Sequence, residues 1–215
     1  MLRYTLTLLT LIAITLIACP LMLDNGPTHT HTYDASTLLS TQCDTLPIEH
    51  GISYHTSPTY YATCTNAYAY ASTLLTPTTT PSTIVMDLDE TLFSGVGLNE
   101  YLYREGLSFS YDRQLAYMDT HVYTLVHGAL PFIRHAQSLG YTIVFVTNRK
   151  PMHKAPTMKH LSYYGLSDMD VLYRTDVKDK APRIASLTNV VMTIGDKDND
   201  HIPGITNVFL PNKLY

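Results

Sequence analysis

Two carboxylates lie close together in the run Asp87-Leu88-Asp89-Glu90-Thr91, directly after the apolar residues Ile84-Val85-Met86. If the apolar residues form a regular strand, Asp87 and Asp89 face the same side, because side chains alternate along a strand. Carboxylates this close repel each other unless a cation lies between them or they share a proton. Mg²⁺ prefers oxygen ligands and suits a site completed by water and phosphate. The pair therefore indicates metal-assisted chemistry on a phosphate group.

The two carboxylates of such a pair can take different roles in a phosphoryl transfer. Asp87 can attack the phosphorus atom and form an acyl-phosphate. Asp89 is placed to protonate the leaving oxygen and then to activate the water that hydrolyses the intermediate. The metal and nearby cations offset the charge on the transferring group. The alternative is that the pair is a solvated turn at the end of a strand.

Further polar residues follow two other apolar runs. Residues 141–146 lead into Thr147-Asn148, and residues 190–194 lead into Gly195-Asp196. Continuous β-branched runs suit strands that are buried on both faces of a parallel sheet. Ligands bind at the carboxyl edge of such a sheet. We expect Thr147, with the backbone at Asn148, to bind phosphoryl oxygens at a helix N-terminus, and Asp196 to add a carboxylate.

A cation is also expected at the site, and the sequence offers several. Lys180 is our prediction, although Lys178 is only two residues away and an exposed lysine is usually a solvated charge. Arg149 and Lys150 follow the second polar run. They either contact the substrate phosphate or form the solvated start of a helix.

The elements around these residues alternate between strands and helices. Residues 129–139 and 152–164 are predicted helices, and residues 171–173 and 208–210 are candidate further strands. This alternation predicts an α/β fold with a doubly wound parallel sheet and right-handed crossovers. Apolar and small residues at helical spacing predict one more packed helix over residues 60–75.

The bulk properties limit the possible functions. The 215 residues suit one domain with a sizeable core and are too few for two large ones. The net charge is −4, from 14 basic and 18 acidic residues. The chain therefore has no basic excess to neutralise a nucleic-acid backbone, and we expect no nucleic-acid partner.

Residues 1–19 have the composition of a secretory signal. Met1-Leu2-Arg3 is a short positive region, and the apolar run Leu6–Ala18 is too short to span a bilayer comfortably. The run ends in Leu16-Ile17-Ala18-Cys19, which resembles the bacterial lipoprotein signal. We therefore expect an exported protein that faces the periplasm or the exterior and is held at a membrane by lipid on Cys19. An ordinary cleaved signal and an uncleaved anchor are the alternatives.

Residues 20–57 are rich in Thr, His, Pro and Ser and show little periodicity. This composition favours a linker between the anchor and a folded domain over residues 58–215. If Cys19 carries lipid, Cys43 and Cys64 remain, either as a disulfide or as two thiols, and their spacing decides neither. Neither has a CxxC partner, so a zinc site is not expected.

The run Asp87-Leu88-Asp89-Glu90-Thr91 resembles the first motif, DxDxT, of the haloacid-dehalogenase-like (HAD) phosphatases. The other motifs follow in that family's order, namely Thr147 at a strand end, Lys180 in Lys-Ala-Pro-Arg, and Gly195-Asp196-Lys197-Asp198-Asn199-Asp200. Four motifs in the right order are specific together, although each alone is not. The resemblance implies a HAD-like Rossmannoid sheet with a small, mainly helical cap inserted after the first motif.

Within this superfamily the chain is most similar to the bacterial class C acid phosphatases (subfamily IIIB), which are secreted or lipid-anchored phosphomonoesterases. The likeness lies in residues 145–150, in the lipoprotein-like signal and in Leu210-Pro211-Asn212-Lys213-Leu214-Tyr215. The fourth motif also resembles that of the class B acid phosphatases, so both classes stay open.

The resemblance also implies a role for each motif residue. Asp87 is the nucleophile and Asp89 the acid and base. The metal is held by the Asp87 carboxylate, the Asp89 backbone carbonyl and Asp196. Asp200 orients either Lys180 or a metal-bound water.

Residues 95–128 are where this superfamily inserts the cap that selects the substrate. Aromatic residues in this segment either form a wall that stacks on a nucleobase or phenyl ring, or pack in an ordinary core. They are Tyr101, Tyr103, Phe109 and Tyr111.

These features together predict a Mg²⁺-dependent acid phosphatase that hydrolyses small phosphomonoesters, such as nucleotides or aryl phosphates. Two alternatives remain at this stage. One is a surface lipoprotein in which the catalytic site is vestigial and the fold serves binding. The other is a phosphoprotein phosphatase with the same DxDxT chemistry.

Overall fold

The computed structural model describes residues 32–34 and 48–214. The predicted signal over residues 1–19, which includes Cys19, lies outside the described residues. Cys43 also lies outside them.

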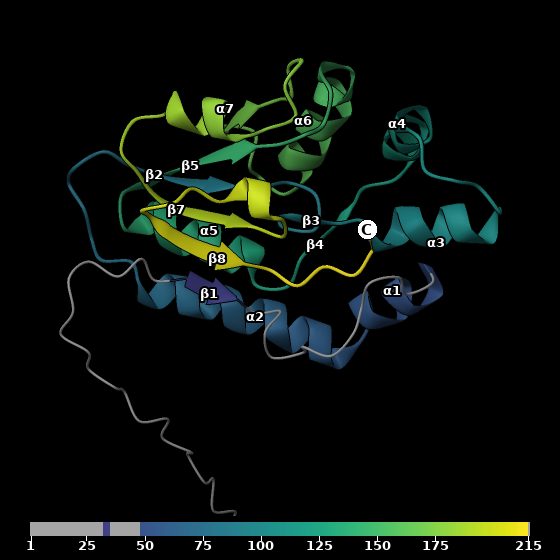
Figure 1. Ribbon diagram of the computed structural model, residues 1–215, viewed down its shortest axis with the longest axis horizontal. Coiled ribbons are helices and arrows are strands. Elements are labelled where there is room, and N and C mark those ends of the chain that lie inside the picture. Colours follow the sequence, from purple (N-terminus) through teal and green to yellow (C-terminus); the bar gives the residue numbers. More distant parts are fainter. Residues whose placement is uncertain (1–31, 35–47, 215) are drawn as a thin grey trace, which may run out of the picture.

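A six-stranded parallel sheet in the order β1-β8-β7-β2-β5-β6 forms the centre of the molecule (Figure 1). Its strands are β1 (Thr32–Asp34), β2 (Ser82–Met86), β5 (Tyr141–Val146), β6 (Asp170–Leu172), β7 (Val190–Gly195) and β8 (Thr206–Phe209). The chain winds outward from β2 to β5 and β6 on one side, and then through β7 and β8 on the other. The predicted doubly wound sheet is thus confirmed, and its reversal of winding lies beside β2, where ligands bind in such sheets.

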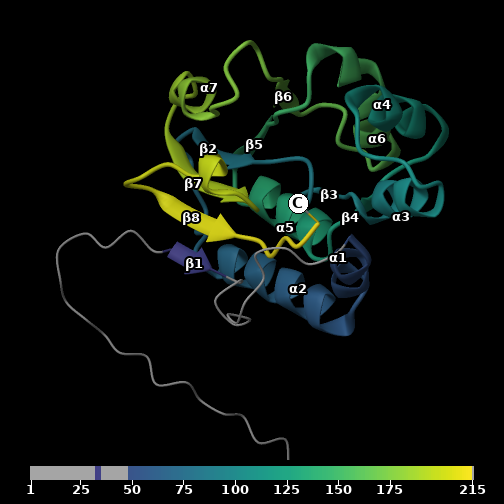
Figure 2. The same ribbon diagram turned by 45° about the vertical axis from the view of Figure 1, so that its right-hand side comes forward.

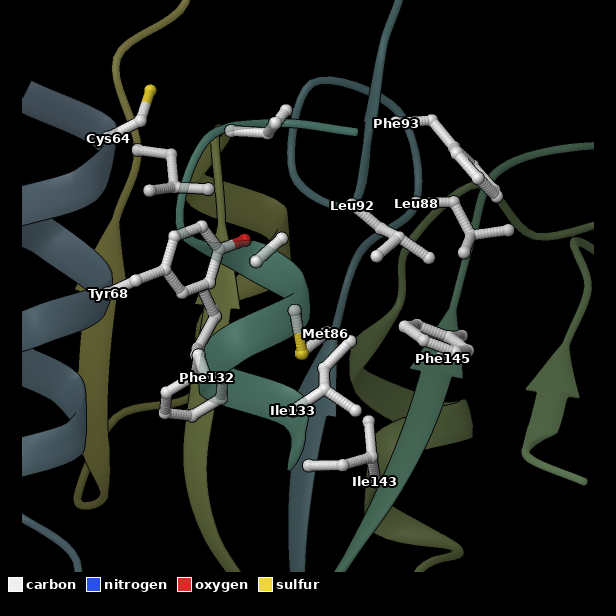
Figure 3. Close-up of a cluster of buried hydrophobic side chains, with 14 of the residues drawn as sticks. Cys64, Tyr68, Met86, Leu88, Leu92, Phe93, Phe132, Ile133, Ile143 and Phe145 are labelled. Atoms are coloured by element: carbon white, nitrogen blue, oxygen red, sulfur yellow. The ribbon is translucent and has the colours of Figure 1, made fainter. Parts of the chain in front are cut away.

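Alternate residues of the central strands face two separate parts of the core, as the period of two along a strand requires. One part packs against α5 (Ala129–Ser138), with α2 (Pro58–Thr73) beyond it (Figure 3). From the strands it receives Ile84, Met86, Ile143 and Phe145. The other part contains Val85, Val144 and Val146, and packs against Ile184 of α7 (Ala181–Ala185).

The three predicted helices are present, within a few residues of their expected bounds. They are α2, α5 and α6 (Lys154–Tyr163), and a 3₁₀ turn over Pro151–His153 precedes α6. At the start of α2 the Ser57 side chain accepts a hydrogen bond from the Tyr60 N–H at 3.2 Å, and Pro58 takes the first helical position. Both are favourable at a helix N-terminus.

Part of the expected linker over residues 20–57 is structured. Residues Ile48–His55 form α1, which contacts α2 and the cap helix α3 (Val96–Arg104). Strand β1 pairs with β8 at the edge of the sheet. These short elements have little periodicity of their own because tertiary contacts stabilise them. The packed part of the chain therefore begins before residue 58.

The cap follows the first motif, as expected. It consists of α3 and α4 (Tyr111–Thr120), and the antiparallel pair β3 (Phe93–Ser94) and β4 (Thr124–Leu125) joins it to the main domain. Figures 1 and 2 show both cap helices beyond the carboxyl ends of the central strands. The cap therefore lies at the edge of the sheet where the predicted catalytic residues emerge. In the described part of the chain, no helix is long and apolar enough to cross a membrane.

Candidate active site

The carboxyl ends of three adjacent strands bring the predicted residues together. Asp87 directly follows β2, Thr147 follows β5, and Asp196 follows the last residue of β7. The Asp87 backbone N–H donates to the Ile194 carbonyl at 3.0 Å, so the ladder between β2 and β7 continues into the site. Tyr68 of α2 stabilises the loop after β2, because its hydroxyl donates to the Thr91 carbonyl at 2.8 Å.

Three carboxylates form a group that suits a metal ion. Asp87, Asp196 and Asp200 each place one oxygen within 4.8 Å of the others. Asp87 and Asp200 are buried, and Asp196 is partly buried. Burial, together with the Asp200 charge, raises the pKa of Asp196 to about 7. Carboxylates that are destabilised in this way, and that offer oxygen ligands, fit a hard divalent cation.

Lys180 is the cation that the structure places at this group. Its Nζ lies 2.5 Å from Asp87 Oδ1 and 2.5 Å from Asp200 Oδ1, and its side chain is buried. Burial alone would lower the pKa of Lys180, but the Asp87 and Asp200 carboxylates outweigh burial and raise it. Lys178, the alternative, is exposed.

Asp200 is held in place from both of its oxygens. Oδ1 accepts from Lys180, while Oδ2 accepts from the backbone N–H groups of Asp196 at 3.1 Å and Lys197 at 3.0 Å. A Cβ at Gly195 would overlap the Asp200 carboxyl, so only glycine fits under this side chain. Asp200 thus contacts Lys180, one of the two partners that the resemblance allowed, and its three hydrogen bonds leave few acceptor positions for a metal.

The Asp89 carboxylate is not part of this group of three carboxylates. Arg149 Nη2 contacts Asp89 Oδ1 at 2.6 Å, and Arg149 Nε contacts Oδ2 at 3.0 Å. Burial tends to raise the pKa of Asp89, but the Arg149 charge and hydrogen bonds outweigh this effect and lower it. The Asp89 carboxylate is thus directed to Arg149, and the metal contact expected from the Asp89 backbone carbonyl stays a prediction.

Arg149 is a site residue that the sequence left undecided. Its side chain is buried, its Nη1 donates to Thr157 Oγ1 at 3.0 Å, and its guanidinium lies 5.3 Å from the ring centres of Phe93 and Tyr123. Its burial contradicts the solvated helix start, whereas contact with the substrate phosphate stays a prediction. Its position directly after a polar strand end was the only available signal.

Thr147 and Asn148 form a turn that a second arginine holds. Arg183 Nη1 donates to the Thr147 carbonyl at 2.5 Å, and Arg183 Nη2 donates to Asn148 Oδ1 at 2.8 Å. Thr147 Oγ1 accepts the Arg149 N–H at 3.1 Å. The 3₁₀ turn over Pro151–His153 begins four residues after Thr147 and continues into α6. Binding of phosphoryl oxygens by Thr147 and Asn148 at this helix start stays a prediction.

The family model of the HAD superfamily, subfamily IIIB (acid phosphatase), matches residues 30–215. The chain belongs to this family. As a member of it, the protein is a phosphomonoesterase. None of the curated protein sequences matches the chain.

Two solved structures share the fold of this phosphatase. One is the class C acid phosphatase from Bacillus anthracis, with 20% sequence identity and a TM-score of 0.69. The other is the class C acid phosphatase from Bacillus anthracis with tungstate bound, with 19% identity and a TM-score of 0.67. Each comparison covers 78% of this chain and 84% of the other.

A cavity of about 540 Å³ lies beside Asp89. Its lining combines the first motif, the cap and the fourth motif. The lining residues are Asp89, Phe109, Tyr111, Gln114, Asn148, Arg149, Lys178, Lys197, Asp198 and Asn199.

Two of the four cap aromatics reach this cavity. Phe109 and Tyr111 line it, whereas Tyr103 lines a separate cavity of 510 Å³ and Tyr101 packs against Tyr117. The expected aromatic wall is thus reduced to one pair.

Proposed function

We propose that the phosphatase is a Mg²⁺-dependent acid phosphatase that works through an aspartyl-phosphate on Asp87. The observation that carries this proposal is the separation of two nearby carboxylates. Asp87 contacts Lys180 and belongs to the group of carboxylates that could hold a metal. Asp89 accepts hydrogen bonds from Arg149 and lines the cavity. Carboxylates held in such different environments can take different roles in one reaction.

The metal would be held by the carboxylates of Asp87 and Asp196 and by the backbone carbonyl of Asp89. When bound, Mg²⁺ would offset the negative charge of the phosphoryl group. Lys180 offsets negative charge at Asp87, while Asp200 keeps the lysine in place.

The reaction then proceeds in two steps. A carboxylate oxygen of Asp87 forms a bond to phosphorus as the bond from phosphorus to the leaving oxygen breaks, and Asp89 donates a proton to that oxygen. Asp89, now ionised, takes a proton from water. The resulting nucleophile attacks phosphorus, which releases inorganic phosphate and restores Asp87. Because Arg149 lowers the pKa of Asp89, the acid form needed for the first step is favoured at acidic pH.

Arg149→Met should reduce kcat/KM for an alkyl phosphate by roughly 10- to 100-fold, because Asp89 loses the two guanidinium hydrogen bonds that orient it. The variant should also stay active to a higher pH. Without the Arg149 charge the pKa of Asp89 rises, so its acid form persists as the pH increases. The pH dependence of kcat/KM on glycerol phosphate measures both effects, since this poor leaving group depends on the acid.

Arg149→Lys is the matched control. It keeps a positive charge but cannot make the paired guanidinium hydrogen bonds. Its kcat/KM should therefore fall, while its pH profile stays near that of the wild type. An unchanged pH profile in Arg149→Met would show that Asp89 is not the acid.

The substrates we propose are small phosphomonoesters with an aryl or nucleoside leaving group. Phe109 and Tyr111 line the cavity beside Asp89, and aromatic rings stack favourably on flat leaving groups. The ring of Tyr111 is itself held, because Lys150 Nζ lies 4.3 Å from its centre. The Bacillus anthracis structure with tungstate bound supports uptake of a phosphate-like oxyanion by this fold.

Removal of metal tests the proposed function. Protein lacking residues 1–19 should hydrolyse p-nitrophenyl phosphate with Mg²⁺, lose at least about a hundredfold in rate with EDTA, and recover when Mg²⁺ is restored. A rate that is unaffected by EDTA would contradict the metal-dependent mechanism. Phosphopeptides that are hydrolysed far faster than nucleotides and aryl phosphates would instead assign a phosphoprotein substrate.

We also propose that the phosphatase is exported and held at a membrane by lipid on Cys19. The support is the signal-like sequence of residues 1–19, which ends in Leu16-Ile17-Ala18-Cys19. Mass spectrometry of the mature protein should find an acylated cysteine at the N-terminus. An N-terminus at Met1, or an unmodified Cys19, would contradict the anchor.

A further inference from the structure

The C-terminal residues 210–214 run from the sheet directly past the carboxylate group. The Leu210 N–H donates to the carbonyl of Gly195, the last residue of β7, at 2.8 Å. Leu210 and Leu214 are both buried, so this tail is packed at both ends. In Figure 1 the end of the yellow segment that follows β8 lies close to α3 and α1. The tail is therefore packed against the main domain next to the end of β7.

Asn212, in the middle of this tail, contacts Asp196 directly. Its Nδ2 donates to Asp196 Oδ2 at 2.6 Å, and its Oδ1 accepts the Leu214 N–H at 2.8 Å. Since Oδ1 must accept from a backbone N–H, the group that faces Asp196 is the NH₂. The direction of the hydrogen bond to the carboxylate is thus determined by the tail itself.

This hydrogen bond leaves the two oxygens of Asp196 in different states. Oδ2 accepts from Asn212, whereas Oδ1 has, among the residues that the structure describes, one long contact of 3.5 Å with Thr91 Oγ1. Partners that bond one oxygen of a ligating carboxylate orient the other and often decide the metal affinity. We propose that Asn212 is a positioning residue that fixes the Asp196 carboxylate and leaves Oδ1 available to the metal. This inference rests on the metal site of the proposed function.

Helix α1 holds the tail from the other side. The Lys213 N–H donates to His55 Nε2 at 2.9 Å, and Lys213 Nζ lies 4.5 Å from the ring centre of Tyr54. A Cβ at Gly51 would lie only 2.5 Å from the Lys213 carbonyl oxygen, so the helix and the tail backbone are in close contact. The position of Asn212 is thus determined by packing and does not depend on Asp196 alone.

Calorimetric titration with Mg²⁺ tests the inference without relying on activity. Asn212→Ala should raise the Mg²⁺ dissociation constant by about 10- to 100-fold. At saturating Mg²⁺ its kcat should stay within roughly threefold of the wild type, because the reacting groups are unchanged. Asn212→Leu fills the space of the side chain and removes only the amide, so it should weaken Mg²⁺ binding to a similar extent even if the alanine variant folds poorly.

Asn207→Ala is the matched control. Asn207 is also a buried amide bonded at both ends, accepting from Thr193 Oγ1 and the Ile202 N–H and donating to the Ile202 carbonyl. Its hydrogen bonds involve no carboxylate, so its loss should lower the unfolding temperature and leave Mg²⁺ affinity unchanged. Wild-type affinity in both Asn212 variants, or an equal loss in Asn207→Ala, would overturn the positioning role alone. No Mg²⁺ binding by the wild type would overturn the metal site and this inference with it.

Discussion

Replacing Asp87 by asparagine should lower kcat by at least about 10⁴-fold, because the amide cannot form the aspartyl-phosphate. Asparagine has nearly the same size as aspartate, so the core around β2 stays packed. Loss of the negative charge also removes one of the two carboxylates that contact Lys180, while the contact with Asp200 remains. The fold should therefore survive, and the loss should appear in kcat.

Steady-state hydrolysis of p-nitrophenyl phosphate measures this loss, with circular dichroism as the check on folding. Asp176→Asn serves as the matched control, because Asp176 is exposed in the loop before Lys180. It should leave the rate unchanged. Undiminished activity in Asp87→Asn would show that another group is the nucleophile.

Replacing Lys180 by methionine should destabilise the metal-free protein by about 3–5 kcal/mol, the usual cost of removing one partner from a buried ion pair. Lys180 is only 2% exposed, and it is the cation that lies between Asp87 and Asp200. Methionine keeps the length and the apolar stem, so the loss reports the charge and not the packing. For a domain of this size the unfolding temperature should fall by roughly ten degrees.

The same substitution should lower kcat by about 10²- to 10³-fold, because a preorganised cation no longer offsets the charge of the transferring group. Thermal unfolding in EDTA measures the stability effect, and turnover at saturating Mg²⁺ measures the catalytic one. Lys178→Met is the control, since Lys178 is exposed and should not contribute to stability. If the two methionine variants unfolded at the same temperature, Lys180 would not be the cation that stabilises these carboxylates.

The sheet and its catalytic edge could be predicted from the sequence because they depend on local patterns. Residues 84–86, 141–146 and 190–194 are continuous apolar runs that end in polar residues. Strands of this kind are buried on both faces, and the carboxyl ends of parallel strands lie at one edge. The positions of Asp87 and Asp196 follow from these two facts.

The prediction of Lys180 in place of Lys178 depended on the order of the family's motifs and not on periodicity. The two lysines lie close together in a segment without periodicity. Only the packed structure shows that Lys180 is buried beside Asp87 and that Lys178 is exposed.

For the DxDxT run itself, the sequence determined which carboxylates are present and at which edge of the sheet they emerge. The tertiary structure decided what each of them contacts. Asp89 meets Arg149 across 60 residues of chain, and Lys213 meets His55 across 158. Contacts at such separations depend on how helices and loops pack around the sheet, and packing is a property of the whole chain. No spacing or composition in one segment records it.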